Sequence, residues 1–110
     1  MNCQRDDRGF EWDDGFRDTA PAGSYPDGRS HFGVYDMLGN VTEWVGDWYD
    51  FRAYRDIADT NPRGPVEGEF KSLRGGSWFT PPGNLGTYVR DNLDPTAAQA
   101  TIGFRCARLP

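Results

Sequence analysis

The sequence is poor in the residues that bind transition metals and in those that form aliphatic cores. It has two cysteines, one histidine and two methionines in 110 residues. His31 has no second histidine or cysteine nearby at ligand spacing, so no zinc or non-haem iron site is predicted within this chain. No run of 18 apolar residues is present for a membrane span, and the first 25 residues lack the apolar stretch of a signal peptide.

Basic residues are also scarce. Seventeen acidic residues stand against twelve basic ones, and the formal net charge is −5. A protein that binds a phosphate backbone usually carries a basic stripe, whereas the arginines here are spread along the chain. No nucleic-acid partner is therefore predicted.

Glycine, proline and aromatic residues are abundant. The chain has 14 Gly and 8 Pro, together with seven Phe, five Tyr and four Trp. So many breakers exclude a coiled coil or a four-helix bundle, and the core must form from aromatic rings set among turns. The length fits one small domain, but aliphatic residues are too sparse to make it stable with ease. Either a metal or a disulfide stabilises the domain, or it belongs to a larger unit.

The two cysteines allow one disulfide at most. A bridge from Cys3 to Cys106 would close nearly the whole chain. The alternative is that the two thiols are free or separately paired, and spacing alone does not decide between them.

Short strands separated by long irregular segments are predicted. Residues 41–45 are β-branched and aromatic, with Glu43 on the face of Val41 and Val45 as a buried acid. Residues 1–30 are predicted to be loop, and residues 51–70 a surface loop with at most one helical turn. Further strands are expected at 72–78, interrupted by glycines, at 87–89 and at 101–106.

One segment has the composition of a calcium site. Asp36 and Glu43 bracket a turn at Gly39-Asn40, and calcium prefers a mixture of carboxylate and carbonyl oxygens. The alternative is that Asp36 caps a turn and Glu43 forms a salt bridge with an arginine. A second oxygen-rich patch combines Asn2 with residues 13–16.

Three motifs carry a family resemblance. They are Gly33-Val34-Tyr35-Asp36-Met37-Leu38-Gly39-Asn40-Val41-Thr42-Glu43-Trp44, then Leu73-Arg74-Gly75-Gly76-Ser77-Trp78, then Ile102-Gly103-Phe104-Arg105. In this order and spacing they resemble the formylglycine-generating enzyme (sulfatase-modifying factor) family, and they span almost the whole chain.

The resemblance implies an α+β fold with little regular secondary structure, of the C-type-lectin-like kind. It also implies that residues 1–110 form a single domain equivalent to the C-terminal portion of the family domain, which is usually more than twice as long. A second chain supplying the N-terminal part is then one expected partner.

Two structural calcium sites follow from the resemblance. The first would use the side chains of Asp36 and Glu43 with the carbonyls of Gly39 and Val41. The second would use the side chains of Asn2 and Asp14 with the carbonyls of Cys3 and Phe16.

Copper is not expected. The aerobic family enzymes bind copper through two cysteines, and those positions hold Thr80 and Leu85 here. Thr42 replaces an active-site tryptophan of the family. Cys106 matches a family cysteine whose disulfide partner lies upstream of this chain. Formylglycine formation is therefore not predicted.

Three functions remain open, and the sequence does not predict a location in the cell. The first is a binding module for a protein or peptide, similar to the variable proteins of diversity-generating retroelements. The second is the substrate-side half of a family enzyme, either a formylglycine-generating oxidase or an ergothioneine-type sulfoxide synthase. The third is an accessory member without chemistry.

For the binding module, rigid strands carrying buried Trp78 and Phe104 rings are expected to frame the ligand surface. Arg90 would offer a planar fork to an acid or amide, or else pair with Asp91 or Asp94. The predicted ligand residues are Ser77, Trp78, Thr80, Asn84, Tyr88, Arg90 and Asn92.

Overall fold

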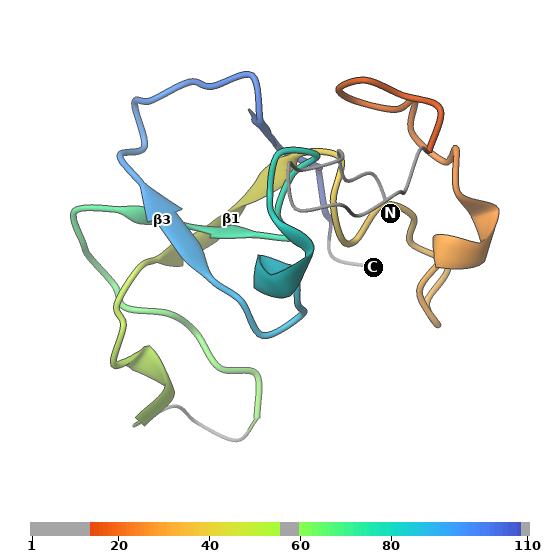
Figure 1. Ribbon diagram of the computed structural model, residues 1–110. Helices are drawn as coiled ribbons and strands as arrows, with labels where there is room; N and C mark the ends of the chain where they lie inside the picture. Colours follow the sequence, from red (N-terminus) through yellow and green to blue (C-terminus); the bar gives the residue numbers. More distant parts are fainter. Residues whose placement is uncertain (1–13, 56–59, 109–110) are drawn as a thin grey trace.

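Four short strands form one mixed sheet in the computed structural model, which describes residues 14–55 and 60–108 (Figure 1). The strand order is β3-β2-β1-β4. β1 pairs antiparallel with β2, β2 antiparallel with β3, and β1 parallel with β4. The strands are β1 Thr42–Trp48, β2 Lys71–Arg74, β3 Asp91–Leu93 and β4 Ile102–Gly103.

β1 is the longest strand and confirms the expectation for residues 41–45. Its β-branched and aromatic side chains favour the extended backbone. The pairing with β2 runs from Glu43 opposite Arg74 to Trp48 opposite Lys71, and its register shifts between Trp44 and Trp48. Such an irregularity bends a strand and increases its twist.

The predicted strand 72–78 is correct only in its first half. β2 ends at Arg74 because Gly75 and Gly76 adopt φ of 90° and 65°, which leaves the extended region. Leu73, at 3% exposure, is the most buried hydrophobic residue in the described ranges. The sheet therefore centres on β2.

The strand predicted at 87–89 is wrong. The chain pairs with β2 only at β3, where Leu93 lies opposite Lys71 and Asp91 opposite Leu73. Tyr88 is instead 77% exposed. Strand identity here is set by the available partner rather than by local β-propensity.

The closing strand is shorter than predicted. Of residues 101–106 only Ile102 and Gly103 form β4, next to Thr42 and Glu43 of β1. Phe104 is 75% exposed, so the expectation of a buried ring at this position is wrong.

The helices in the described ranges are single 3-10 turns, in agreement with the expected α+β class of low regular structure. They are η1 Pro26–Gly28, η2 Ala53–Arg55 and η3 Pro82–Asn84. η1 and η3 begin at a proline, whose fixed φ suits the first helical position. η2 supplies the one helical turn expected between residues 51 and 70. No helix in the described part is long and apolar enough to cross a bilayer.

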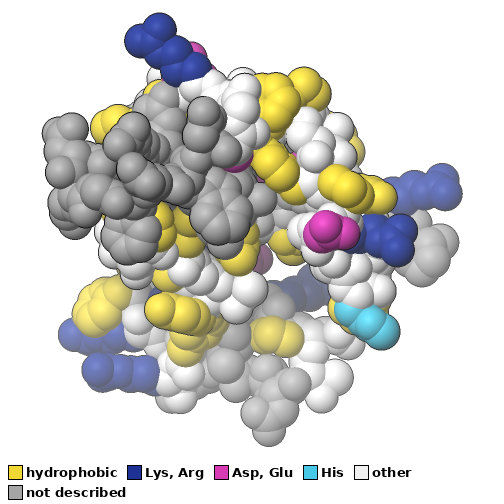
Figure 2. Space-filling view, turned by 45° about the vertical axis from the view of Figure 1, so that its right-hand side comes forward, with side chains coloured by type: hydrophobic (Ala, Val, Ile, Leu, Met, Phe, Trp, Pro, Cys, Tyr) yellow, Lys and Arg dark blue, Asp and Glu magenta, His cyan; other side chains and the backbone are white. Residues whose placement is uncertain are grey.

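The described residues bury little apolar surface. Only Ala20 and Leu73 are buried hydrophobics within residues 14–55 and 60–108. Large side chains such as Phe32, Val66 and Phe79 are more than 70% exposed. Figure 2 shows hydrophobic side chains reaching the surface at several separate places on one face. The fully buried apolar core among the described residues is therefore small.

Candidate functional site

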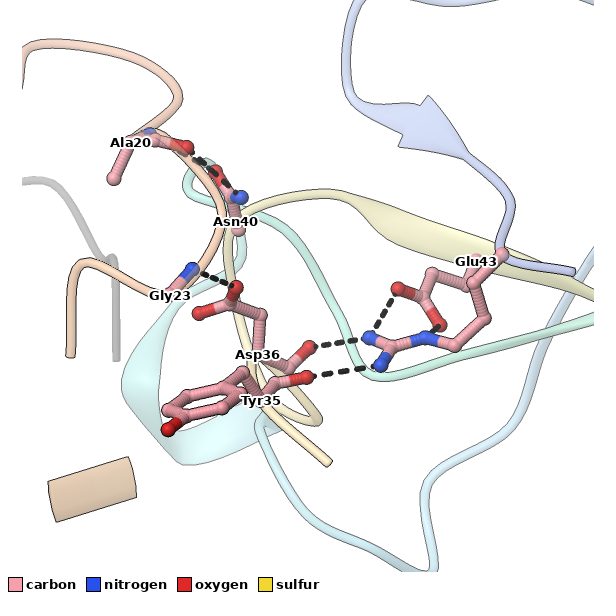
Figure 3. Close-up of polar contacts among 7 residues, drawn as sticks. Ala20, Gly23, Tyr35, Asp36, Asn40 and Glu43 are labelled. Atoms are coloured by element: carbon pink, nitrogen blue, oxygen red, sulfur yellow. Dashed lines mark hydrogen bonds and ion pairs between the residues drawn. The ribbon is translucent and has the colours of Figure 1, made fainter. Parts of the chain in front are cut away.

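Arg105 joins β1 to the turn at residues 35–36. Its Nε donates to Oε2 of Glu43 at 2.6 Å, and its Nη2 donates to Oε1 at 2.5 Å. The same guanidinium donates to the carbonyl oxygens of Tyr35 and Asp36, both at 2.9 Å. Figure 3 shows Glu43 on one side of this group and the two carbonyls on the other. Four hydrogen bonds thus converge on one side chain.

This arrangement has a clear electrostatic consequence. The hydrogen bonds with Glu43 raise the pKa of Arg105 further above its ordinary value, so the guanidinium stays charged. Arg105 thereby neutralises an acid that the sequence suggested as buried, and whose side chain is 22% exposed. The salt-bridge alternative for Glu43 is the geometry observed.

Both carboxylates of the predicted calcium site have protein partners in this structure. Both carboxylate oxygens of Glu43 are bound to Arg105, and Oδ2 of Asp36 accepts a hydrogen bond from Gly23 N at 2.8 Å. Gly39 is buried and donates its amide to the carbonyl of Gly75. A cation at Glu43 would have to displace Arg105. Calcium binding at Asp36, Gly39, Val41 and Glu43 therefore stays a prediction, and it requires that Arg105 moves away from Glu43.

The second predicted calcium site falls partly outside the described residues, since Asn2 and Cys3 lie there. Asp14 accepts hydrogen bonds from the amide of Phe16 at 3.0 Å and from the hydroxyl of Tyr25 at 2.9 Å. Cys106 is exposed and free within the part of the chain that the structure describes. Across residues 14–55 and 60–108, no group of three or more His, Cys, Asp and Glu side chains is arranged to hold a metal ion.

Asn40 fixes the turn between the predicted ligands. Its side chain accepts from the amide of Ala20 at 3.0 Å and donates to the carbonyl of Ala20 at 3.1 Å. Its own carbonyl accepts from the amide of Trp78 at 2.9 Å. Asn40 adopts a φ of 65°, a left-handed conformation that asparagine tolerates better than most residues. This role was not predicted, although the Gly-Asn pair was recognised as a turn.

A pocket of about 260 Å³ opens where β2 ends and β3 begins, and we call it the β2–β3 pocket. The apolar and glycine residues of its lining are Leu73, Val89, Gly75 and Gly76. The polar residues that line it are Thr42, Arg74, Thr80, Asn84, Arg90 and Asp91. The pocket thus contains three of the seven predicted ligand residues.

The two positions that hold copper cysteines in the family resemblance lie against the same glycine. A methyl group at Gly76 would overlap the side chain of Leu85 and lie 3.4 Å from Thr80 Cβ. The Thr80 hydroxyl accepts from the amide of Ser77 at 2.9 Å, and Thr80 donates its own amide to the Ser77 carbonyl at 3.0 Å. The hydroxyl therefore closes a tight turn at the edge of the pocket.

Arg90 contacts the loop after β1. Its Nη1 donates to the carbonyl of Asp50 at 2.9 Å and its Nη2 to that of Phe51 at 3.4 Å. The guanidinium carbon lies 4.1 Å from the centre of the Tyr54 ring and 5.2 Å from that of Tyr49. Such contacts stabilise a cation over an aromatic face. Within the described residues Arg90 has no ion pair with Asp91 or Asp94, the partners that were considered for it.

The other four predicted ligand residues lie outside the pocket lining. Ser77 is buried at 4% exposure, and Trp78 is half-buried with its ring edge-on to Phe79 at 5.6 Å. Tyr88 is exposed and Asn92 lies on β3. Of the seven predicted ligand residues, only Thr80, Asn84 and Arg90 therefore line the pocket, although Ser77 is hydrogen-bonded to Thr80.

A second cavity, of about 500 Å³, lies beside β1 and has a mainly apolar lining that includes Met37, Trp44 and Val45. Arg74 lines both cavities. Arg74 was missed by the sequence analysis, because a single arginine before a Gly-Gly pair gives no signal of what it faces.

The whole chain matches one known family. The model of a sulfatase-modifying factor enzyme 1-like domain covers residues 2–110. The chain belongs to the formylglycine-generating enzyme family. The expected α+β fold of that family is therefore confirmed for the described residues.

Curated relatives of this family member are much longer than the chain. The serine/threonine-protein kinase pkn1 of Chlamydia caviae is 42% identical in an alignment of 93 positions that covers 83% of this chain and 15% of that protein. The formylglycine-generating enzyme of Streptomyces coelicolor is 35% identical in an alignment of 99 positions that covers 86% of this chain and 31% of the enzyme.

Two solved structures share the fold. PvdO from Pseudomonas aeruginosa is similar with a TM-score of 0.72 and 36% identity, over 83% of this chain and 34% of PvdO. Variable protein 1 of Treponema denticola is similar with a TM-score of 0.54 and 30% identity, over 74% of this chain and 33% of that protein. The chain spans about a third of each.

Proposed function

We propose that this member of the formylglycine-generating enzyme family is a non-catalytic binding module whose ligand is a segment of protein or peptide. The β2–β3 pocket carries the proposal. Thr80 and Asn84 line it, and Thr80 stands at a copper-cysteine position of the family resemblance. Because neither Thr80 nor Leu85 supplies a thiolate, the pocket offers polar and apolar contacts but no soft metal ligands.

The size and position of the pocket support a binding role. At about 260 Å³ it is just below the usual range for a small-molecule site and suits a single side chain of a larger ligand. It lies at the ends of hydrogen-bonded strands, and binding residues on loops held by a stiff scaffold are common.

The similarities to known proteins favour the same proposal. Variable protein 1 of Treponema denticola shares the fold, and a retroelement-diversified variable protein is one form that such a module could take. The region similar to this chain makes up 15% of the chlamydial pkn1 protein, as expected for a module within a larger protein. Calcium is proposed as a structural ion at Asp36 and Glu43, under the condition that Arg105 moves.

The test is selection of peptides from a random twelve-residue display library by the intact protein. We expect enriched peptides whose binding is weakened at least tenfold by Asn84→Ala. Asn92→Ala is the matched control, because Asn92 lies on β3 outside the pocket lining. Failure to enrich any peptide over a column without protein would refute the binding module.

The alternative is the substrate-side half of a family enzyme, supported by the similarity to the Streptomyces formylglycine-generating enzyme. It is tested by incubating the protein with copper, oxygen and a Cys-x-Pro-x-Arg peptide, with the Streptomyces enzyme as positive control. We expect mass spectrometry to show the thiol unchanged. An aldehyde product above the level without protein would favour the enzyme.

A further inference from the structure

Two arginines lie at adjacent strand positions where the β2–β3 ladder ends. The pairing of these antiparallel strands reaches Leu73 opposite Asp91. One further step along the same register sets Arg74 opposite Arg90. Like charges directly opposite one another in a sheet are destabilising. Both arginines also line the β2–β3 pocket.

Neither arginine forms an ion pair with an acid in the described part of the chain. Within residues 14–55 and 60–108, no carboxylate oxygen forms an ion pair with Arg74 or Arg90 at 4.0 Å or less. Asp91 also lines the pocket, but its Oδ1 accepts from the amide of Asn92 at 2.7 Å. The pocket therefore holds two cations and one acid that is paired to neither.

The bonds that these arginines do make leave most of their donors unused. Arg74 Nη1 donates to the carbonyl of Val89 at 2.5 Å, and Arg90 donates to the carbonyls of Asp50 and Phe51. A guanidinium has five N–H donors. Four on Arg74 and three on Arg90 have no protein acceptor among the described residues. The carbonyl contacts fix the position of both cations without cancelling their charge.

Resting on the proposed binding module, we infer that the β2–β3 pocket recognises an acidic side chain, Asp or Glu, of a peptide ligand. A carboxylate placed between the two guanidinium groups would accept hydrogen bonds from both and relieve their repulsion. Thr42, Thr80 and Asn84 lie around the same space, so the carboxylate would enter a polar pocket.

A phosphate-backbone ligand is disfavoured by the rest of the molecule. The net charge is −5, and the volume of about 260 Å³ suits one side chain rather than a nucleotide. An acidic side chain delivers its single charge to a pocket in which Arg74 and Arg90 have no ion pair with any described residue. The net negative charge of the protein would then disfavour ligands with many negative charges.

The test uses the intact protein and the peptides enriched in the display selection, resynthesised with amidated C-termini so that side chains supply the only carboxylates. We expect the enriched peptides to share an Asp or Glu, and its change to Asn or Gln to weaken binding at least tenfold, which is ~1.4 kcal/mol. This change is made in the ligand, so its effect does not depend on any protein variant folding.

The protein side of the test is a double-mutant cycle with Arg74→Gln and Arg90→Gln. Each variant should bind the acidic peptide more weakly and the amide peptide with nearly unchanged affinity, because only the acid interacts with the lost charge. Arg63→Gln is the matched control, since Arg63 is exposed and lies outside the pocket lining.

The possible results separate the two proposals. Enriched peptides that bind equally well as acid and amide would overturn the acidic-ligand inference and leave the binding module standing. Failure to enrich any peptide would overturn the binding module and with it this inference. The two arginine variants could also lose binding of both the acidic and the amide peptide. The inference would then still be supported if the unmodified protein binds the acidic peptide much more tightly than the amide peptide.

Discussion

Arg105 and Glu43 are 62 positions apart in the sequence and form a two-pronged ion pair across the sheet. The pair joins the segment after β4 to β1, and the carbonyls of Tyr35 and Asp36 complete the set of acceptors (Figure 3). Two of the three family motifs are thereby bound together by one side chain.

Loss of the paired hydrogen bonds between Arg105 and Glu43 should destabilise the fold. Arg105→Lys keeps the charge but cannot bind Glu43 through two parallel bonds, so we expect the free energy of unfolding to fall by about 1–2 kcal/mol. The partial exposure of both side chains keeps the effect in this range. Denaturant unfolding is the measurement, with the exposed Arg108→Lys as control. An equal loss of stability in both variants would contradict the role assigned to the two hydrogen bonds between Arg105 and Glu43.

Calcium and Arg105 should compete for Glu43. Because both carboxylate oxygens are bound by the guanidinium, Arg105→Gln is expected to bind calcium about tenfold more tightly than the unmodified protein, equivalent to ~1.4 kcal/mol. Isothermal titration with calcium, after treatment with a chelator, measures this difference. Glu43→Gln in addition to Arg105→Gln should abolish the gain. Weaker binding in Arg105→Gln would mean that the arginine supports the ion rather than excluding it.

Gly76 is expected to be essential for the turn that follows β2. Gly76→Ala should lower the free energy of unfolding by about 1–2 kcal/mol, because φ is 65° and the new methyl group would overlap Leu85. Gly83→Ala is the matched control. Gly83 has no atom within 4 Å of an added Cβ and no positive φ, so its variant should be nearly as stable as the unmodified protein. Similar losses at both positions would argue against a specific turn.

The Asp94 carboxyl offers a pH-dependent test of local structure. Hydrogen bonds from the side chain and the amide of Thr96, at 2.6 Å and 2.8 Å, hold the pKa of Asp94 below its ordinary value. A lowered folded pKa stabilises the fold above the unfolded pKa, and this contribution is lost as the pH falls through the folded pKa. Thr96→Val should raise the pKa of Asp94 toward its ordinary value.

Carbon-detected NMR titration of the Asp94 carboxyl group measures this change directly. Thr96→Ser keeps the hydroxyl and should titrate like the unmodified protein. An unchanged Asp94 titration in Thr96→Val would show that the hydrogen bond from the Thr96 amide alone lowers the pKa of Asp94.

Several features could be read from the residues alone. The three motifs identified the family, and the β-branched and aromatic residues around Trp44 located β1 because extended backbone accommodates such side chains. The glycines after Arg74 marked a departure from regular geometry, although the strand was expected to continue beyond them. Thr80 and Leu85 stand at the positions of the copper cysteines in the family resemblance, and the absence of copper stays a prediction.

Other features depend on which residues meet in space. Sequence alone suggested a strand at 87–89, whereas β3 forms at Asp91–Leu93 because that is where the chain reaches the free edge of β2. Glu43 looked equally suited to calcium or to an arginine, and Arg105 occupies both its oxygens because the fold carries residue 105 back beside β1. The residues thus determined the family, the turns and the chemical groups available. Only the tertiary structure decided their partners, because hydrogen bonds and ion pairs form over a few ångströms between groups that lie far apart along the chain.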